Sequence, residues 1–190
     1  MLSLLRRNAD NLFETIDNLN EIVSFQLNDK TQTKPINLQE QITKTLTAIQ
    51  ALSEKQRAEF NVFVDANLNI NYNPAYLESI LLNFFTNAIK YKHPERDPKI
   101  RISAFFEDGK VILEIKDNGS GIDLKRHGKK LFGMYKTFHD NADARGIGLF
   151  ITKNQVEALL AQFHIWQLIT GSPSVLIKAN SCDICQLGDG

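Results

Sequence analysis

Three polar side chains interrupt an otherwise apolar segment, ILLNFFTNAIKY, which runs from residue 80 to residue 91. Asn83, Asn87 and Lys90 are spaced by four and then three residues, so a helix here presents them on one face. Asparagine is unfavourable in the middle of a helix, and a buried amide without partners costs about 1–3 kcal/mol. We therefore expect a polar group to face this stripe.

A carboxylate ends a second apolar segment, KVILEIKD. Alternate apolar residues share one face of the predicted strand: Val111, Leu113 and Ile115. The same period of two brings Asp117 to that face at the strand end. A carboxylate accepts a hydrogen bond from an exocyclic amine and repels a carbonyl oxygen, so it could select adenine over guanine. Gly119 and Gly121 would let the backbone approach such a ligand, although DNGSG alone is more typical of an ordinary turn.

A third element, RGIGL, leads directly into a predicted helix. Gly146 and Gly148 leave backbone N–H groups exposed at the positive end of the helix dipole, which suits phosphate oxygens. The segment lacks the G-x-x-x-x-G-K-[ST] pattern, which excludes a P-loop. Its place late in an antiparallel layout argues against a dinucleotide-binding fold.

The elements that position these residues form an α+β pattern. A helix from Asn73 to Lys92 carries the amide stripe and ends at the two prolines of HPERDP. The strands KIRISAFF and KVILEIKD follow, and the Asp-Gly pair between them is a hairpin signal. Adjacent antiparallel strands favour an α+β layer over a doubly wound parallel sheet. Further predicted elements are a helix capped by Asn37, a strand in EFNVFVD, a helix in GIGLFITKNQVEALLAQ and a last pair of strands in FHIWQLITG and SVLIKAN.

The two ends of the chain differ from its centre. An a/d heptad pattern runs through the first segment, at Leu5, Ala9, Leu12, Ile16, Leu19 and Val23. This helix packs either on its own domain or in a bundle or dimer, and the strict spacing favours the second reading. We expect a dimerisation-type helix at 1–30, a linker at 31–36, one domain at 37–180 and a disordered tail at 181–190. The tail holds Cys182 and Cys185, which would provide only two of the usual four zinc ligands.

Length and charge exclude several classes of protein. The 190 residues suffice for one substantial core, and 22 basic residues balance 22 acidic ones. This balance predicts no nucleic-acid surface and no polybasic membrane patch. No apolar run approaches the roughly 18 residues of a membrane span, and the N-terminus lacks a signal-peptide pattern. We therefore expect a cytoplasmic chain without a membrane segment, although a parent protein could be anchored in a membrane.

The order of these elements resembles the GHKL ATP-binding superfamily. More narrowly, LLNFFTNAIKY, DNGSGI, LFGMYKTFH and RGIGLFITKNQVEAL resemble the N, G1, F and G2 boxes of the catalytic domain of sensor histidine kinases. The resemblance covers about residues 37 to 160. It implies a two-layer α/β sandwich of the Bergerat type, with a mixed, mostly antiparallel sheet and helices on one face. The helix before Asp29 resembles the second helix of that family's dimerisation and phosphoacceptor hairpin.

The resemblance also implies roles for individual residues. Asn87 would be the ligand of a Mg²⁺ ion that bridges the phosphates of ATP, with Asn83 and Lys90 beside it as further catalytic residues. Asp117 would read adenine, and residues 124–145 would form a lid over the nucleotide. The full set implied to bind nucleotide is Asn83, Asn87, Lys90, Tyr91, Asp117, Gly119, Gly121, Ile122, Arg145, Gly146, Gly148 and Leu149.

The resemblance implies a protein-histidine kinase rather than an ATPase. Hydrolysing members carry a glutamate at the position of Asn83, and an amide is a poor general base for water. The histidines lack the context of a phosphoacceptor: His93, His127, His139 and His164. We therefore expect the γ-phosphoryl of Mg·ATP to pass to a histidine on a helix that precedes this chain. The implied partners are that phosphoacceptor helix, a response-regulator receiver domain and a second copy of the chain, bound through the N-terminal helix.

Two segments depart from the family pattern. Ala144 stands where another glycine is expected, and Leu160 and Ala161 replace a usual Gly-Gly pair. A nucleotide-sensing or structural pseudokinase, which would dimerise and signal without phosphotransfer, therefore remains the alternative. Magnesium-dependent ATP binding together with labelling of a supplied acceptor helix would separate the two.

Overall fold

A computed structural model describes residues 33–107, 109–121, 148–157, 162–167 and 173–180. Three of the predicted segments lie largely or wholly outside these ranges and stay predictions: the helix at 1–30, the lid at 124–145 and the tail at 181–190. Ile122, Arg145 and Gly146 of the expected nucleotide site also lie outside the described residues.

Five strands form one mixed sheet. They are β2 (Glu59–Phe63), β4 (Lys99–Glu107), β5 (Lys110–Asp117), β6 (Gln162–Gln167) and β7 (Pro173–Asn180). The spatial order is β2-β4-β5-β7-β6, in which β2 and β4 are parallel. The pairs β4-β5, β5-β7 and β6-β7 are antiparallel. The predicted α+β class with a mixed, mostly antiparallel sheet is therefore confirmed.

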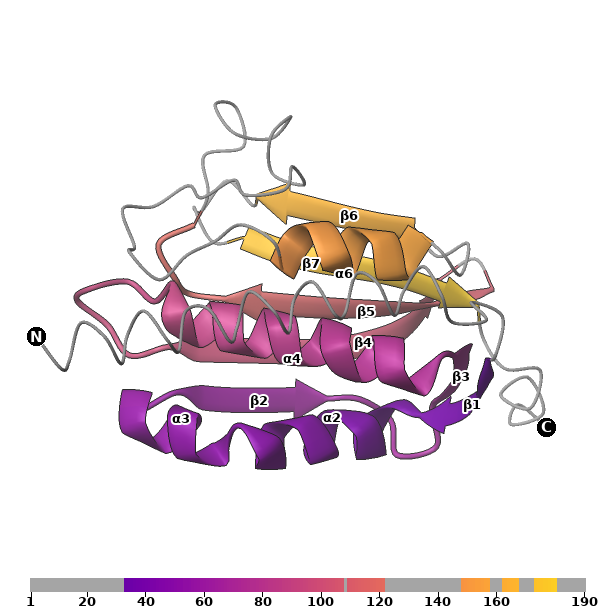
Figure 1. Ribbon diagram of the computed structural model, residues 1–190, viewed down its shortest axis with the longest axis horizontal. Helices are drawn as coiled ribbons and strands as arrows, with labels where there is room; N and C mark the ends of the chain where they lie inside the picture. The colour runs from indigo at the N-terminus through magenta and orange to yellow at the C-terminus, as the bar shows by residue number, and fades with distance from the viewer. Residues whose placement is uncertain (1–32, 108, 122–147, 158–161, 168–172, 181–190) are drawn as a thin grey trace, which may run out of the picture.

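Helices cover one face of this sheet. Helices α2 (Leu38–Ala48), α4 (Pro74–Lys90) and α6 (Gly148–Glu157) lie side by side in front of the strands, and the short α3 (Gln50–Gln56) follows α2 (Figure 1). The core lies between the two layers. Its fully buried apolar side chains, each 0% exposed, are Leu38, Ile42, Ile80, Leu81, Phe85, Ile100, Ile102 and Val156.

Asparagine side chains cap two helices on this face, and the cap at Asn37 was predicted. Asn73 Oδ1 accepts hydrogen bonds from the N–H groups of Ala75 and Tyr76, at 3.0 and 3.2 Å, and Pro74 is the first residue of α4. These bonds satisfy backbone donors that have no partner inside the first turn. Asn37 Oδ1 likewise caps α2 by accepting from the Glu40 N–H at 2.9 Å. The caps fix where α4 begins, and therefore which turn of the helix carries the amide stripe.

The β4-β5 hairpin brings Asp117 to the helix-covered face. Glu107 pairs with Lys110 across the turn, and Gly109 has a φ of 73°, a left-handed conformation that glycine adopts without strain. The register then places Asp117 opposite Ile100, which is 0% exposed. The alternate residues of β5 are buried in the core as predicted: Val111, Leu113 and Ile115.

A strand begins within the segment 31–36 that was expected to be a linker. Strand β1 (Lys34–Asn37) pairs antiparallel with β3 (Asn69–Tyr72) in a separate two-stranded sheet. Neither strand is predicted above, since each has four residues and its partner lies more than thirty residues away. Pro35 breaks a helical pattern but fits an edge strand, where its missing N–H is tolerated.

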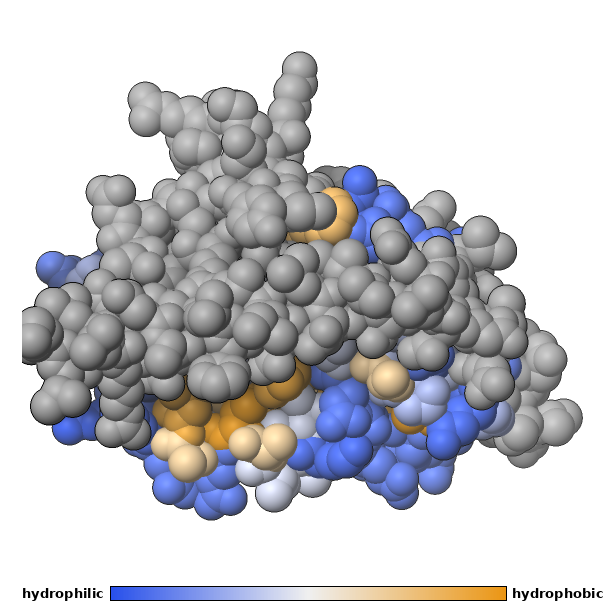
Figure 2. Space-filling view, in the orientation of Figure 1, coloured by the Kyte–Doolittle hydropathy of each residue, from blue (hydrophilic) through white to orange (hydrophobic). Residues whose placement is uncertain are grey.

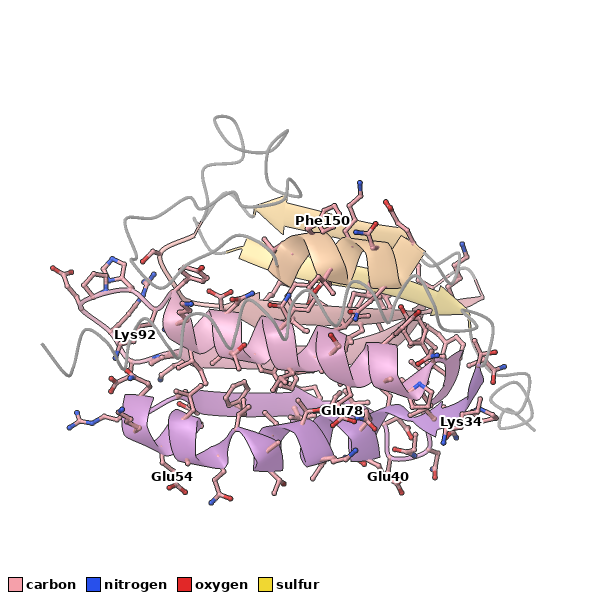
Figure 3. All side chains as sticks on the ribbon, in the orientation of Figure 1. Lys34, Glu40, Glu54, Glu78, Lys92 and Phe150 are labelled. Carbon is pink, nitrogen blue, oxygen red and sulfur yellow. The ribbon has the colours of Figure 1, made fainter. Side chains whose placement is uncertain are left out.

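The surface of the helical layer has both hydrophobic and hydrophilic regions. On the face seen in Figure 2, hydrophobic surface gathers between α3 and α4, and hydrophilic residues cover the other end of α2. Leu52 on α3 and Leu82 on α4 are 37% and 41% exposed. Lys44 on α2 and Glu78 on α4 form an exposed ion pair of 3.0 Å. Figure 3 shows Glu78 on the side of α4 that faces α2. Within the described part of the chain, no helix combines the length and the apolar character that a membrane crossing requires.

Candidate functional site

The amide stripe on α4 is hydrogen-bonded internally and to α6. Asn87 Nδ2 donates to Asn83 Oδ1 at 2.9 Å. Asn83 Nδ2 donates in turn to Thr152 Oγ1 at 2.6 Å. Thr152 is 1% exposed, so one of the polar partners expected for the stripe is a buried hydroxyl of the neighbouring helix. Thr152 was not predicted to contact the stripe, because it is 69 residues from Asn83 and nothing in the segment RGIGLFITKNQVEAL indicates that contact.

The glycine at the start of α6 permits this close packing of the two helices. A Cβ atom on Gly148 would collide with Asn83 Oδ1 and would lie 3.1 Å from its Cγ. The missing side chain of Gly148 therefore allows α6 to lie close to α4, in addition to any exposure of backbone N–H groups. The next residue, Leu149, is partly buried against the core.

The C-terminal end of α4 carries the remaining residues of the predicted stripe. Lys90 is exposed on the last turn of the helix. Tyr91 follows it, and its N–H donates to the backbone oxygen of Asn87 at 2.9 Å. Figure 3 shows Lys92 just beyond this end of the helix. The stripe thus runs from the middle of α4, where it faces α6, to an exposed end.

Asp117 is half-buried and is the last residue of β5, where the segment 117–121, the Asp117 turn, begins. Its Oδ1 accepts a hydrogen bond of 2.7 Å from the N–H of Gly119. Burial raises the pKa of the Asp117 carboxyl, although the Gly119 N–H and the charge of Arg96 act in the opposite direction. Its Oδ2 accepts no hydrogen bond from the residues that the structure describes, which leaves one oxygen available to a ligand.

Two hydrogen bonds join this turn to the residues that follow α4. The N–H of Ser120 donates to Tyr91 O at 3.0 Å, and the Ser120 hydroxyl donates to Lys92 O at 3.2 Å. Gly119 packs so closely that an added Cβ would lie 2.6 Å from Tyr91 O. The helix that carries Asn83 and Asn87 and the turn that carries Asp117 therefore form one connected unit.

Two further side chains link the turn to residues 96–99 by hydrogen bonds. Arg96 Nη2 donates to Gly119 O at 3.2 Å. Asn118 Nδ2 donates to Asp97 O at 3.0 Å, and its Oδ1 accepts from the Lys99 N–H at 2.8 Å. Gly121 has a φ of 72°, a conformation that favours glycine. The sequence analysis treated HPERDP only as the end of a helix, because the contact of Arg96 with the turn spans 23 residues.

A family model agrees with this arrangement. The family described as "Histidine kinase-, DNA gyrase B-, and HSP90-like ATPase" matches residues 72–176, which is more than half of the chain. The chain belongs to this family. The match includes α4, the Asp117 turn and α6, so the elements of the candidate site lie within the region that matches the family.

Individual relatives agree with the family assignment. The histidine-protein kinase AtoS of Escherichia coli is 29% identical over 153 residues, which are 77% of this chain and 24% of AtoS. The histidine kinase AdeS of Acinetobacter baumannii has a similar fold, with a TM-score of 0.75 at 18% identity over 96% of this chain and 84% of AdeS. ShkA, solved in complex with AMPPNP, gives a TM-score of 0.76 at 17% identity over 95% of this chain and 38% of its own. The chain spans about a quarter of the length of the curated relatives that it matches first, 23% and 24%.

Among the described groups of this site, the side-chain oxygen of Asn87 could hold a divalent cation. Asn87 Nδ2 is engaged by Asn83, whereas Asn87 Oδ1 accepts no hydrogen bond from a described residue, and such an oxygen suits a hard cation. No group of three or more His, Cys, Asp or Glu side chains in the described ranges could hold a metal ion. A cation beside Asn87 would therefore take most of its ligands from phosphate and water, as Mg²⁺ does at nucleotide sites.

Proposed function

We propose that this chain is the catalytic part of a sensor histidine kinase, which binds Mg·ATP beside α4 and the Asp117 turn. Its γ-phosphoryl group would be transferred to a histidine on a partner helix. One observation carries the proposal: α4, with the oxygen of Asn87, and the Asp117 turn are joined by the bonds of Ser120 to Tyr91 and Lys92. A ligand with a metal-bound polyphosphate at one end and an exocyclic amine at the other matches this pair of groups.

Each residue would act by binding or positioning. Asp117 Oδ2 would accept a hydrogen bond from the amine of adenine, while Gly119 holds Oδ1. Asn87 Oδ1 would ligate Mg²⁺, which neutralises phosphate charge when bound. Lys90 would place its ammonium group beside phosphate oxygens. Phosphoryl transfer needs mainly such positioning and charge stabilisation.

Transfer is favoured over hydrolysis by the chemistry of Asn83. Its Nδ2 donates to Thr152 and its Oδ1 accepts from Asn87, so the amide is engaged at both ends. A neutral amide also has no useful basicity at neutral pH, and it therefore cannot activate water as a carboxylate does. The relative ShkA was solved with AMPPNP, and this supports a nucleotide ligand for the present chain.

The wider setting of the domain belongs to the same proposal. The whole protein would dimerise through residues 1–30 and pass the phosphoryl group from the histidine to a response-regulator receiver domain. The domain limits of 37–180, the nucleotide contacts of Ile122, Arg145 and Gly146, and a cytoplasmic location stay predictions from the sequence.

Calorimetric titration with ATP and GTP in the presence of Mg²⁺ tests the nucleotide assignment. We expect ATP to bind more tightly than GTP, because a carboxylate repels the carbonyl oxygen of guanine. Asp117→Ala should remove this preference. Equal affinities of the unmodified chain for ATP and GTP would refute the role of Asp117. If the chain binds Mg·ATP but labels no supplied phosphoacceptor helix from [γ-³²P]ATP, it is a nucleotide-sensing pseudokinase.

A further inference from the structure

Thr152 contacts the amide stripe of α4, although it lies on another helix. It lies on α6, one turn after Gly148, and is 1% exposed. A buried hydroxyl is costly unless it is hydrogen-bonded, and this one accepts from Asn83 Nδ2 at 2.6 Å. The bond therefore joins α6 to α4 through one particular amide, whose Nδ2 faces the hydroxyl.

The orientation of that amide determines the orientation of the next. An asparagine amide turned by 180° keeps its shape but exchanges its donor and its acceptor, so the surrounding hydrogen bonds decide which end points where. With Nδ2 of Asn83 directed at Thr152, Oδ1 of Asn83 faces Asn87 and accepts from its Nδ2 at 2.9 Å. The oxygen of Asn87 is then the end of the amide that is directed away from Asn83.

We propose that Thr152 is a positioning residue for the metal ligand: it holds Asn83 in the orientation that leaves Asn87 Oδ1 available to Mg²⁺. This inference rests on the proposed function of the site. Without the hydroxyl, Asn83 Nδ2 loses its acceptor on α6, and the amide can regain a hydrogen bond for Nδ2 by rotating to offer it to Asn87. Asn87 would then turn its oxygen toward Asn83 and its Nδ2 toward the cation, and an N–H donor cannot ligate a metal ion.

A second hydrogen bond between the same helices provides a matched control. Gln155 Nε2 donates to Ser79 Oγ at 3.0 Å, about one turn along each helix from the bond between Thr152 and Asn83. Gln155 is 2% exposed, so this bond is also buried. Ser79→Ala removes an interhelical bond of the same kind, but it leaves Asn83 and Asn87 untouched. An effect on helix packing alone would appear in both variants.

The test compares the ATP affinity of the chain in EDTA with that in saturating Mg²⁺, by calorimetry. Thr152→Val keeps the shape of the side chain and removes the acceptor. We expect it to reduce the Mg²⁺-dependent gain in affinity about tenfold, the size of effect typical of groups that orient a metal ligand, and to leave the Mg²⁺-free affinity unchanged. Thr152→Ser should keep the gain, because it keeps the hydroxyl. Ser79→Ala should keep it as well.

A second measurement needs no nucleotide. In the ligand-free chain, NMR should show slowly exchanging side-chain NH₂ protons for Asn83 and Asn87, and this protection should be lost in Thr152→Val only. An unchanged Mg²⁺-dependent gain in Thr152→Val would overturn the inference and leave the proposed function intact. An equal loss in Thr152→Val and Ser79→Ala would assign Thr152 to packing alone and would also overturn it. Absence of Mg²⁺-dependent ATP binding in the unmodified chain would instead overturn the proposed function, and the inference with it.

Discussion

Replacement of Gly119 by alanine tests whether the Asp117 turn must lie against the end of α4. The added Cβ would lie 2.6 Å from Tyr91 O and 2.7 Å from Asp117 Oδ1, and Cβ atoms essentially never approach other atoms below 3.0 Å. The carboxylate can rotate, although it then loses the Gly119 N–H. The carbonyl belongs to the backbone and cannot rotate away. The turn must therefore move off the helix, which stretches the 3.0 Å bond from the Ser120 N–H to Tyr91 O.

The expected cost combines three contributions. Insertion of a methyl group into a packed contact costs about 1–3 kcal/mol, and loss of one hydrogen bond costs about 1 kcal/mol. Alanine also gives the unfolded chain less conformational entropy than glycine does, which raises the free energy of unfolding by about 0.4–1 kcal/mol. We therefore expect Gly119→Ala to lower the free energy of unfolding by about 2 kcal/mol. It should also weaken ATP binding, because Asp117 moves with the turn.

Urea unfolding followed by circular dichroism measures the first effect, and calorimetry measures the second. Gly109→Ala is the control, since its Cβ would meet no atom within 4 Å and only its φ of 73° is strained. That variant should lose stability by about 1–2 kcal/mol and keep its ATP affinity. A free energy of unfolding for Gly119→Ala within about 0.5 kcal/mol of the unmodified chain would refute the reasoning, because surface substitutions without special contacts give changes of that size.

Two further predictions concern the metal ligand and the carboxylate. Asn87→Ala should remove most of the Mg²⁺-dependent gain in ATP affinity, which calorimetry measures. If the ATP affinity of the variant still rises with Mg²⁺, Asn87 is not the metal ligand. Because burial raises the pKa of Asp117, the folded state loses stability as pH rises from the unfolded-chain value of about 3.9 through that raised pKa. Asp117→Asn should therefore be more stable than the unmodified chain at pH 7, by a margin that shrinks as pH is lowered. Urea unfolding between pH 7 and pH 4.5 checks this sign, and a margin that grows on acidification would contradict it.

The elements of the site were predictable because their signals are local. The spacing of Asn83 and Asn87 within an apolar segment predicts a helix with a polar stripe, and α4 has that stripe between Pro74 and Lys90. The period of two along β5 predicts the face on which Asp117 lies, and the register of the hairpin agrees. Helix and strand periods are set by backbone geometry, so a single segment is enough to read them.

The partners of these residues could not be predicted in the same way. The bond of Asn83 to Thr152 joins residues 69 positions apart, and that of Arg96 to Gly119 spans 23. Strands β1 and β3 are short, and each is stabilised by pairing with the other. Such contacts depend on how helices are rotated and how strands are ordered, and no local periodicity records either.

The sequence by itself determined the fold class, the family and the side chains that we propose to carry the chemistry, because periodicity, caps and the order of the motifs are properties of neighbouring residues. The tertiary structure decided that Asn87 and Asp117 belong to one connected unit and that Thr152 contacts Asn83. Those decisions follow from the packing of α6 on α4 and of the Gly119 backbone on Tyr91 O, and such packing exists only once distant segments have come together.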